Sequence, residues 1–257
     1  MGSTLGTLFL IPNTLGNDAR VEQLPWVLPS ETIAQTAKLI HWIVEDAKTA
    51  RAFLKAVDSV SPLACTIQEM QMSEWRGVAR NAKYGDAVKP IDLLKPLIAG
   101  KDMGLMSEAG VPGVADPGAE LVLAAHKLGA KVKPLVGPSS ILLGLMASGL
   151  NGQRFAFQGY IPHDAQDRIA KLKQLEAESR KLQQTQIWIE TPYRNTAMLM
   201  ACLNSLAPQS LLCLGVDLSL TSEMITTLSI AEWRKRYPND AACASLQNRP
   251  TVFLLLA

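Results

Sequence analysis

A loop rich in glycine and proline is the first feature of this sequence that could do chemistry. Residues 106–118 read MSEAGVPGVADPG and hold three glycines and two prolines. Glycine lets a backbone approach a ligand closely and adopt positive φ, and proline stiffens the loop. An ordinary strand-to-helix connection takes about two to six residues. The length of this loop therefore favours a binding site over a plain connection.

Two other corners have a similar character. Residues 12–17 (PNTLGN) and residues 137–140 (GPSS) each follow a short apolar run. The amides and hydroxyls of Ser139 and Ser140 could hold a polar ligand, although a serine N-cap is the simpler explanation of that corner alone. Asp116 is expected to cap the helix that Pro117 begins. If the three preceding runs are parallel strands, the corners line one edge of one sheet, where open α/β sheets bind ligands.

Four carboxylates lie near the ends of predicted strands and could accept a proton from a hydroxyl group. They are Glu45, Asp46, Glu108 and Glu190. A helix cap or a surface charge is the alternative for each of them. Lys48 and Arg194 could hold an anionic acceptor, and ion pairing explains them equally well. The cysteines and histidines lack metal-ligand spacing, so no protein-built metal site is expected.

The composition describes a globular chain. Hydrophobic residues make up 48% and charged residues 19% of 257 residues, and the formal net charge is +2. This nearly neutral total does not indicate a polyanion partner, although a local basic patch remains compatible with it. The apolar runs are too short for a membrane span, and no targeting segment is recognised. We expect a cytoplasmic protein with reduced cysteines and no membrane contact.

These residues must be positioned by two different kinds of sheet. In the first part, strands predicted at residues 7–11, 41–44, 103–107 and 131–136 alternate with helical patterns at 31–38, 48–56, 91–99 and 119–128. That alternation predicts a parallel wound α/β sheet. In the second part, strands predicted at 155–160, 186–190, 211–218, 224–229 and 251–256 accompany helices at 165–183 and 195–206, which predicts a mixed sheet. A turn-rich connection places the boundary between domains 1–150 and 151–257.

At these motifs the chain resembles the tetrapyrrole methylase superfamily, the class III S-adenosylmethionine (SAM) methyltransferases. It is most similar to the group that contains the small-subunit ribosomal RNA cytidine 2′-O-methyltransferase. Residues 107–118 resemble that group's S-D-A-G-T-P-x-x-x-D-P-G motif, and residues 12–17 its P-x-P-x-G-N corner. The other matches are residues 45–48 (an altered E-D-T-R), 136–140, 155–162 and 190–194. Glu108 and Val111 replace the group's Asp and Thr, and residues 248–251 replace a Lys-Gly-Glu segment.

The resemblance implies that SAM binds in a cleft between the two domains and that the protein is a homodimer. It places the amino-acid portion of SAM against one set of residues: Leu15, Ala109, Gly110, Val111, Val114, Ser139 and Ser140. It places the adenosine towards Glu190, Thr191 and the strand around Leu228. Glu108 is the first candidate for the general base, since its loop faces the sulfonium, and Glu45 and Asp46 follow.

Three functions stay open at this point. The first is methylation of ribosomal RNA, with the ribosomal subunit as the partner. The second is methylation of a small molecule such as a tetrapyrrole. The third is SAM binding without turnover, in a sensor or a partner-binding module. The motifs for the methyl donor match the family better than the residues of the acceptor side, so the sequence predicts methyl transfer more firmly than it predicts the acceptor.

Overall fold

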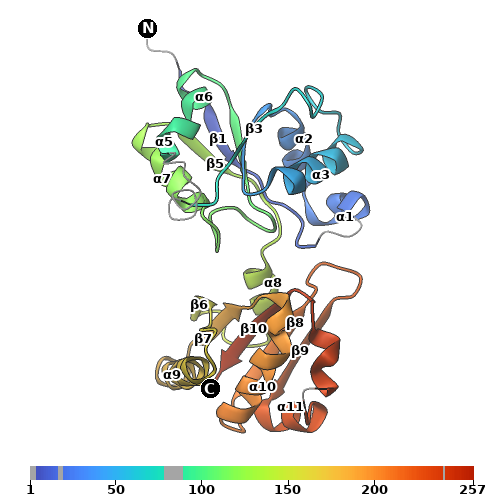
Figure 1. Cartoon of the computed structure of the whole chain (residues 1–257), viewed down its shortest axis with the longest axis vertical. Coiled ribbons are helices and arrows are strands. Elements are labelled where there is room, and N and C mark those ends of the chain that lie inside the picture. Colours follow the sequence, from blue (N-terminus) through green and yellow to red (C-terminus); the bar gives the residue numbers. More distant parts are fainter. Residues whose placement is uncertain (1–3, 17–19, 78–88, 240) are drawn as a thin grey trace. The chain divides into compact units, whose positions relative to one another are not determined.

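The chain forms two compact units, Met1–Pro138 and Ser139–Ala257, in a computed structural model (Figure 1). The structure describes residues 4–16, 20–77, 89–239 and 241–257; Asn17 of the first corner lies outside them. The units divide before α8 (Ser140–Ser148), whereas the sequence placed the boundary after it. The reason is that α8 packs on strands β8, β9 and β10 of the second unit.

The first unit is built on a parallel sheet with the strand order β3-β2-β4-β1-β5. Its strands are β1 (Thr7–Leu10), β2 (His41–Val44), β3 (Gln71–Glu74), β4 (Met103–Met106) and β5 (Lys131–Pro134). Central β4 is buried along its whole length, while edge strands β3 and β5 are mostly exposed. The parallel wound sheet predicted from the sequence is confirmed. Strand β3 was not predicted, because QMSE has no apolar run.

Helices cover both faces of this sheet (Figure 1). They are α1 (Arg20–Val27), α2 (Ser30–Ala37), α3 (Ala47–Asp58), α5 (Pro90–Leu93), α6 (Lys95–Ile98) and α7 (Gly118–Lys127). The predicted helix at 91–99 is two short helices, because Pro96 cannot donate a backbone hydrogen bond and its ring crowds the preceding turn. One apolar cluster, around Phe9, Trp42 and Phe53, includes residues of α1–α3, and the other, around Leu8 and Leu105, lies on the α5–α7 side.

A glycine in β4 permits close packing inside the first unit. Gly104 pairs with Trp42 of the neighbouring strand β2. A Cβ atom at position 104 would lie 2.5 Å from Cζ3 of the Trp42 ring, a separation that real side chains do not tolerate. The indole therefore lies across the backbone of β4, and Trp42 is only 1% exposed.

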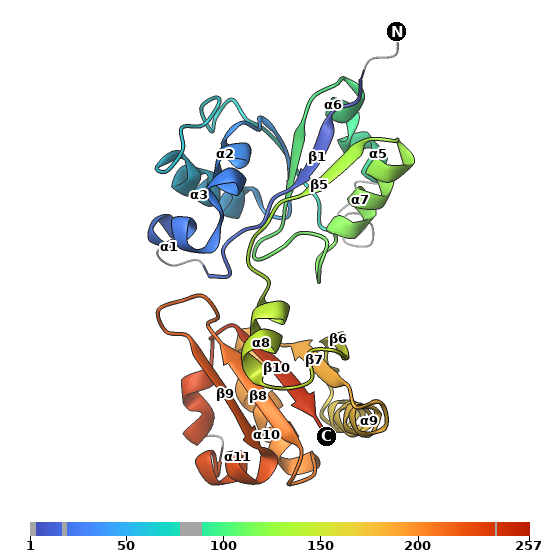
Figure 2. The ribbon, with the colours of Figure 1, turned by 180° about the vertical axis from the view of Figure 1, so that it is seen from behind.

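The second unit is built on a mixed sheet with the order β6-β7-β10-β8-β9, in which β6 and β7 are parallel and the other pairs antiparallel (Figure 2). Its strands are β6 (Phe155–Tyr160), β7 (Thr185–Ile189), β8 (Leu211–Val216), β9 (Met224–Ser229) and β10 (Thr251–Leu256). This confirms the predicted mixed sheet. Its further helices are α9 (Ala165–Leu182), η1 (Pro192–Arg194), α10 (Asn195–Ser205), α11 (Ile230–Arg236) and η2 (Ala242–Leu246).

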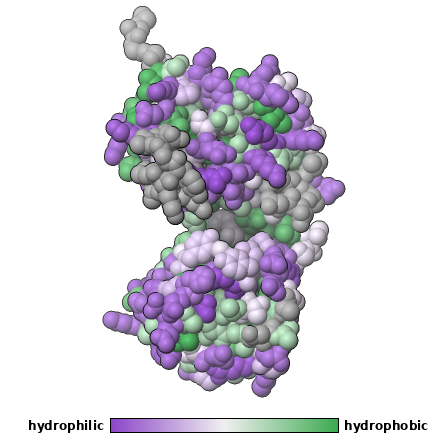
Figure 3. Space-filling view, viewed as in Figure 1, coloured by the Kyte–Doolittle hydropathy of each residue, from purple (hydrophilic) through white to green (hydrophobic). Residues whose placement is uncertain are grey.

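The core of the second unit lies between its sheet and α9–α11. Trp188 of β7 stacks on Phe253 of β10 with ring centroids 5.6 Å apart, and both side chains are fully buried. Helix α8 covers the opposite face, where Gly144 lies against Val252 and Leu254. Hydrophilic side chains dominate the visible face of each unit (Figure 3). Among the described residues, no helix combines the length and the apolar character that a membrane crossing requires.

Candidate functional site

The three glycine-containing corners follow three adjacent strands of the first unit. Because β4, β1 and β5 are neighbours and parallel, their carboxyl ends lie at one edge of the sheet. The corner after β1 and the loop after β4 are joined directly, since the amide of Asn13 donates to the carbonyl of Gly110 at 2.8 Å. Gly110 has φ of +68° at this contact, a conformation that favours glycine. The prediction that these corners line one edge is confirmed.

The side chain of Asn13 reinforces this junction. Its Nδ2 donates to the carbonyl of Glu108 at 2.8 Å and lies 3.4 Å from the carbonyl of Ser107. Its Oδ1 accepts from the amide of Thr14 at 2.8 Å. Asn13 is completely buried. The sequence analysis did not single out this residue, because asparagine is common in turns and its partners lie about 95 positions along the chain.

The third corner packs on the first one through a glycine. A Cβ atom at Gly137 would lie 2.3 Å from both Cβ and Cγ of Pro12. The preceding residue, Val136, is fixed on its other side, where its carbonyl accepts from the hydroxyl of Thr32 at 2.9 Å. The corners at 12–16, 107–118 and 136–138 thus form one packed group.

Asp116 closes the loop of residues 107–118 on itself. One oxygen of its carboxylate accepts from the amide of Gly113 at 2.8 Å, and the other accepts from the amide of Gly118 at 2.6 Å. The residue before the first turn of α7 is Pro117, so Asp116 is not the N-cap that the sequence predicted, although it does accept the first amide of the helix. Burial raises the pKa of Asp116 above its ordinary value, and the hydrogen bonds from Gly118 and Gly113 oppose that rise.

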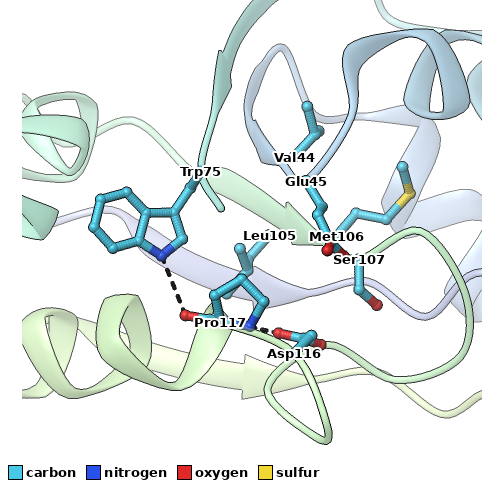
Figure 4. Close-up of a pocket in the computed structure, with 9 residues that line it drawn as sticks. Val44, Glu45, Trp75, Leu105, Met106, Ser107, Asp116 and Pro117 are labelled. Carbon is cyan, nitrogen blue, oxygen red and sulfur yellow. Dashed lines mark hydrogen bonds between the residues drawn. The ribbon is translucent and has the colours of Figure 1, made fainter. Parts of the chain in front are cut away.

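A small pocket lies between this loop and the end of β2 (Figure 4). It is lined by Val44, Glu45, Trp75, Leu105, Met106, Ser107, Asp116, Pro117 and Gly118. The indole nitrogen of Trp75 donates to the carbonyl of Pro117 at 3.1 Å and fixes one wall. Its cavity volume is about 10 Å³, roughly the space that one water molecule needs. The pocket has room for one polar group of a larger ligand.

Two of the predicted catalytic residues, Glu45 and Glu108, lie together. Oε2 of Glu45 is 3.4 Å from the amide of Glu108, which donates to it. Glu108 is exposed and Glu45 half-buried, so both carboxylates can be reached from solvent. Lys48 is also exposed, in the first turn of α3. The structure therefore brings Glu45 to the loop that carries Glu108, as the sequence analysis expected for carboxylates at neighbouring strand ends.

Asp46 is engaged in a different way. Its Oδ1 accepts from the amide of Thr49 at 2.7 Å as the N-cap of α3, and its Oδ2 pairs with Arg76 at 3.3 Å. The hydrogen bonds from Thr49 lower the pKa of Asp46, and the charge of Arg76 lowers it further. Arg76 also donates to the carbonyl of Glu45 at 3.1 Å. The sequence analysis missed Arg76 because it did not predict strand β3, which places it here.

The remaining residues predicted to hold SAM in this region differ in exposure. Ala109 and Val114 are exposed, whereas Val111 and Leu15 are half-buried. In the second unit, Ser139 is the N-cap of α8 and Ser140 its first residue, both half-buried. The hydroxyl of Ser139 accepts from the amide of Leu142 at 3.5 Å. The simpler explanation of the serine corner, a helix cap, is thus realised at Ser139.

The predicted adenosine residues of the second unit do not all lie together. Oε1 of Glu190 accepts from the amide of Thr191 at 2.9 Å, and Oε2 forms an ion pair with Arg194 at 3.2 Å. Arg194 is only 12% exposed and also donates to the carbonyl of Pro162. Leu228 instead pairs with Leu212 near the beginning of β8 and packs against the core cluster. The sheet register therefore places Leu228 at the other end of the sheet from Glu190.

No metal site is found among the described residues: they contain no group of three or more His, Cys, Asp or Glu side chains that could hold an ion. The polar groups at the sheet edge of the first unit are backbone amides, hydroxyls and carboxylates. This donor set suits an organic ligand with both charged and apolar portions.

The fold of the chain is that of the tetrapyrrole methylases. The chain is similar to the crystal structure of the methyltransferase CobJ, with a TM-score of 0.58 and 15% identity over 99% of this chain and 94% of that one. It is also similar to uroporphyrin III C-methyltransferase from Thermus thermophilus, with a TM-score of 0.53 and 13% identity over 98% and 97% of the two chains. At this level of identity the likeness establishes the fold. No family model matches the chain.

Curated relatives share more of the sequence, and two of them are named ribosomal RNA small subunit methyltransferase I. The relative from Pseudomonas aeruginosa is 35% identical over 161 residues, 63% of this chain and 54% of its own length. The relative from Xylella fastidiosa is 30% identical over 205 residues, 80% of this chain and 64% of its own length. The chain thus spans about half to two thirds of these relatives. The chain is thus similar in sequence to proteins named ribosomal RNA small subunit methyltransferase I, and its fold is that of the tetrapyrrole methylases.

Proposed function

We propose that the protein is a SAM-dependent methyltransferase that acts on ribosomal RNA, at a ribose 2′-hydroxyl group. The observation that carries the proposal is the packed group of three corners at one sheet edge, in a chain whose relatives are named ribosomal RNA methyltransferases.

The residues of the first unit fit the amino-acid portion of SAM. Ala109 and Val114 are exposed in the loop, and a Cβ atom at Gly113 would meet no other atom within 4 Å, so this backbone is open to a ligand. We assign the amino-acid portion to Leu15, Ala109, Gly110, Val111 and Val114 of the first unit, and also to Ser139 and Ser140, which begin the second unit. Glu190 and Thr191 are assigned to the adenosine, and Leu228 is left out because it packs against the core.

Bound SAM supplies a methyl group on a sulfonium, which is already an activated leaving group. The protein then has to align the acceptor oxygen with the methyl carbon and to take up a proton. The new carbon–oxygen bond forms as the carbon–sulfur bond breaks, and a carboxylate accepts the hydroxyl proton. We assign that role to Glu108, which is exposed beside the loop, and place Glu45 as the second candidate.

The other predicted polar residues divide between structure and substrate. Asp46 is assigned a structural role, since both of its oxygens are engaged by Thr49 and Arg76. Arg194 is likewise held by Glu190. Lys48, exposed in the first turn of α3, is the cation that we assign to an RNA phosphate. We further propose that the protein works in the cytoplasm as a homodimer.

Calorimetry and labelled-methyl transfer test the proposal in sequence. Wild-type protein should bind S-adenosylhomocysteine, and it should transfer a labelled methyl group from SAM to undermethylated small ribosomal subunits. Glu108→Ala should bind the product normally and lose about 10²- to 10⁴-fold in rate. Glu31→Ala, at an exposed position of α2, is the matched control and should leave the rate unchanged. Absence of binding to folded wild-type protein would refute the whole proposal.

Methylation of a small molecule such as a tetrapyrrole is the second candidate. The observation in its favour is the fold, which the chain shares with CobJ and with uroporphyrin III C-methyltransferase. If the protein binds S-adenosylhomocysteine but labels no RNA, and labels a tetrapyrrole, this candidate replaces the first. Binding with no transfer to either acceptor supports the third function, a SAM-binding protein without turnover.

A further inference from the structure

Asn13 contacts the loop of residues 107–118 but is itself completely buried. We propose that Asn13 is a positioning residue, which turns the amide groups of Ala109 and Val111 towards the carboxylate of the donor's amino-acid portion. The inference rests on the proposed function, because it concerns the same loop. It adds a residue that lies within the corner at residues 12–17 but was not among the predicted site residues.

Three carbonyls of the loop, those of Ser107, Glu108 and Gly110, point towards Asn13. The carbonyl of Glu108 accepts from Nδ2 of Asn13 at 2.8 Å, and the carbonyl of Gly110 accepts from the backbone amide of Asn13 at 2.8 Å. The carbonyl of Ser107 lies 3.4 Å from Nδ2. In a planar trans peptide, the C=O of one residue points opposite to the N–H of the next. Three N–H groups, of residues 108, 109 and 111, are therefore turned away from Asn13.

One of these three amides, that of Glu108, already binds a carboxylate. The N–H of Glu108 donates to Oε2 of Glu45 at 3.4 Å, on the side away from Asn13. The amides of Ala109 and Val111 form no hydrogen bond with any described residue. Ala109 is exposed and Val111 half-buried, and we assign both amides to the ligand. Backbone amides held in fixed directions are an established way to bind an anion.

The side-chain amide of Asn13 is required for this arrangement. Nδ2 is a donor only, and it faces two carbonyl oxygens, while Oδ1 accepts from Thr14. Asn13→Asp keeps the shape of the side chain and replaces that donor by an oxygen. A buried carboxylate oxygen against the carbonyls of Ser107 and Glu108 would repel both and free the loop.

The test compares two ligands that differ in one portion. S-adenosylhomocysteine carries the amino-acid carboxylate, and 5′-methylthioadenosine lacks that portion. We expect calorimetry to show that wild-type protein prefers S-adenosylhomocysteine. In Asn13→Asp that affinity should fall roughly ten- to a hundredfold, while the affinity for 5′-methylthioadenosine should stay the same. Equal losses for both ligands, or no loss for either, would overturn the assignment, because a merely structural role does not distinguish the ligands.

Hydrogen exchange separates this inference from the proposed function. The amides of Asn13, Gly113 and Gly118 are bonded in the wild type and should exchange faster in Asn13→Asp. Asn195→Asp is the matched control, since Asn195 is an equally buried cross-link in the second unit and its loss should leave these amides protected.

Hydrogen exchange tests the positioning role of Asn13 whether or not the methyl donor binds. If wild-type protein binds neither ligand, the proposed function fails, and faster exchange in Asn13→Asp still shows that Asn13 orders the loop. Unchanged exchange refutes the positioning role directly. Asn13→Ala, which leaves a small cavity instead of a repulsive contact, is the second variant if Asn13→Asp does not fold.

Discussion

One added methyl group at Gly137 tests the packing of the three corners. A Cβ atom there would lie 2.3 Å from Cβ and Cγ of Pro12 and 3.0 Å from Cδ2 of Leu28. Carbon atoms pack best at about 3.5–4.0 Å, so Gly137→Ala forces the corner at residues 136–138 away from Pro12 by about 1 Å or more. The proline ring cannot rotate away, and the next residue along the chain is Asn13.

The expected loss of unfolding free energy depends on the backbone conformation of Gly137. Gly137 does not lie in the left-handed region, so alanine is sterically hindered by its neighbours and not by its own backbone. Overpacking of this kind costs about 1–3 kcal/mol of unfolding free energy. Because the displacement is passed to Asn13 and from there to Gly110, we also expect weaker binding of S-adenosylhomocysteine.

Calorimetric unfolding and ligand titration measure the two effects, and hydrogen exchange assigns the loss to the first unit. Gly152→Ala is the control, because a Cβ atom at Gly152 meets nothing within 4 Å and its φ is not positive. That variant should change stability by less than about 1 kcal/mol and leave binding intact. If Gly137→Ala behaves like Gly152→Ala in both measurements, the three corners do not form one packed group.

Three further outcomes follow from the hydrogen bonds and charges. Burial raises the pKa of Asp116 in the folded protein above the ordinary value of 3.8. The stabilisation that Asp116 gives the fold is therefore present below pH 3.8 and is lost as the pH rises through the raised pKa. Between these two pKa values, the stability of the wild type relative to Asp116→Asn should fall as the pH rises. Arg249 pairs through Nε with Oδ2 of the buried Asp217 at 2.8 Å, so Arg249→Met leaves that oxygen to the hydroxyl of Ser222 alone. The substitution should cost about 1–3 kcal/mol in denaturant unfolding, partly recovered by adding Asp217→Asn. Trp75→Phe removes the hydrogen bond to Pro117 and should cost about 1 kcal/mol in the same assay.

The sequence was sufficient for much of the secondary structure. Strands β2, β9 and β10 begin and end where their apolar or β-branched runs predicted, because such residues favour extended backbone at buried or half-buried positions. Strand β3 and helix α1 were not predicted, because their sequences lack such signals. QMSE is polar because β3 is an edge strand that is mostly exposed, and α1 contains Pro25 within its span. Both elements depend on neighbours that are distant in the sequence.

The sequence also determined which corners belong to the site. Their glycines and prolines restrict the local backbone, and three successive corners after parallel strands must share an edge. It could not determine how the corners are joined, because the contacts of Asn13 with Glu108 and of Gly137 with Pro12 span most of the first unit. Such contacts exist only after the strands have assembled.

Tertiary structure alone decided the roles of several candidate side chains. Glu190 and Leu228 were placed together from the sequence, but the strand register sets them at opposite ends of the sheet. Asp46 was a candidate base until the fold supplied Thr49 and Arg76 as its partners. A carboxylate has the same chemistry in every sequence, and only its three-dimensional neighbours fix its charge, its direction and its access to a substrate.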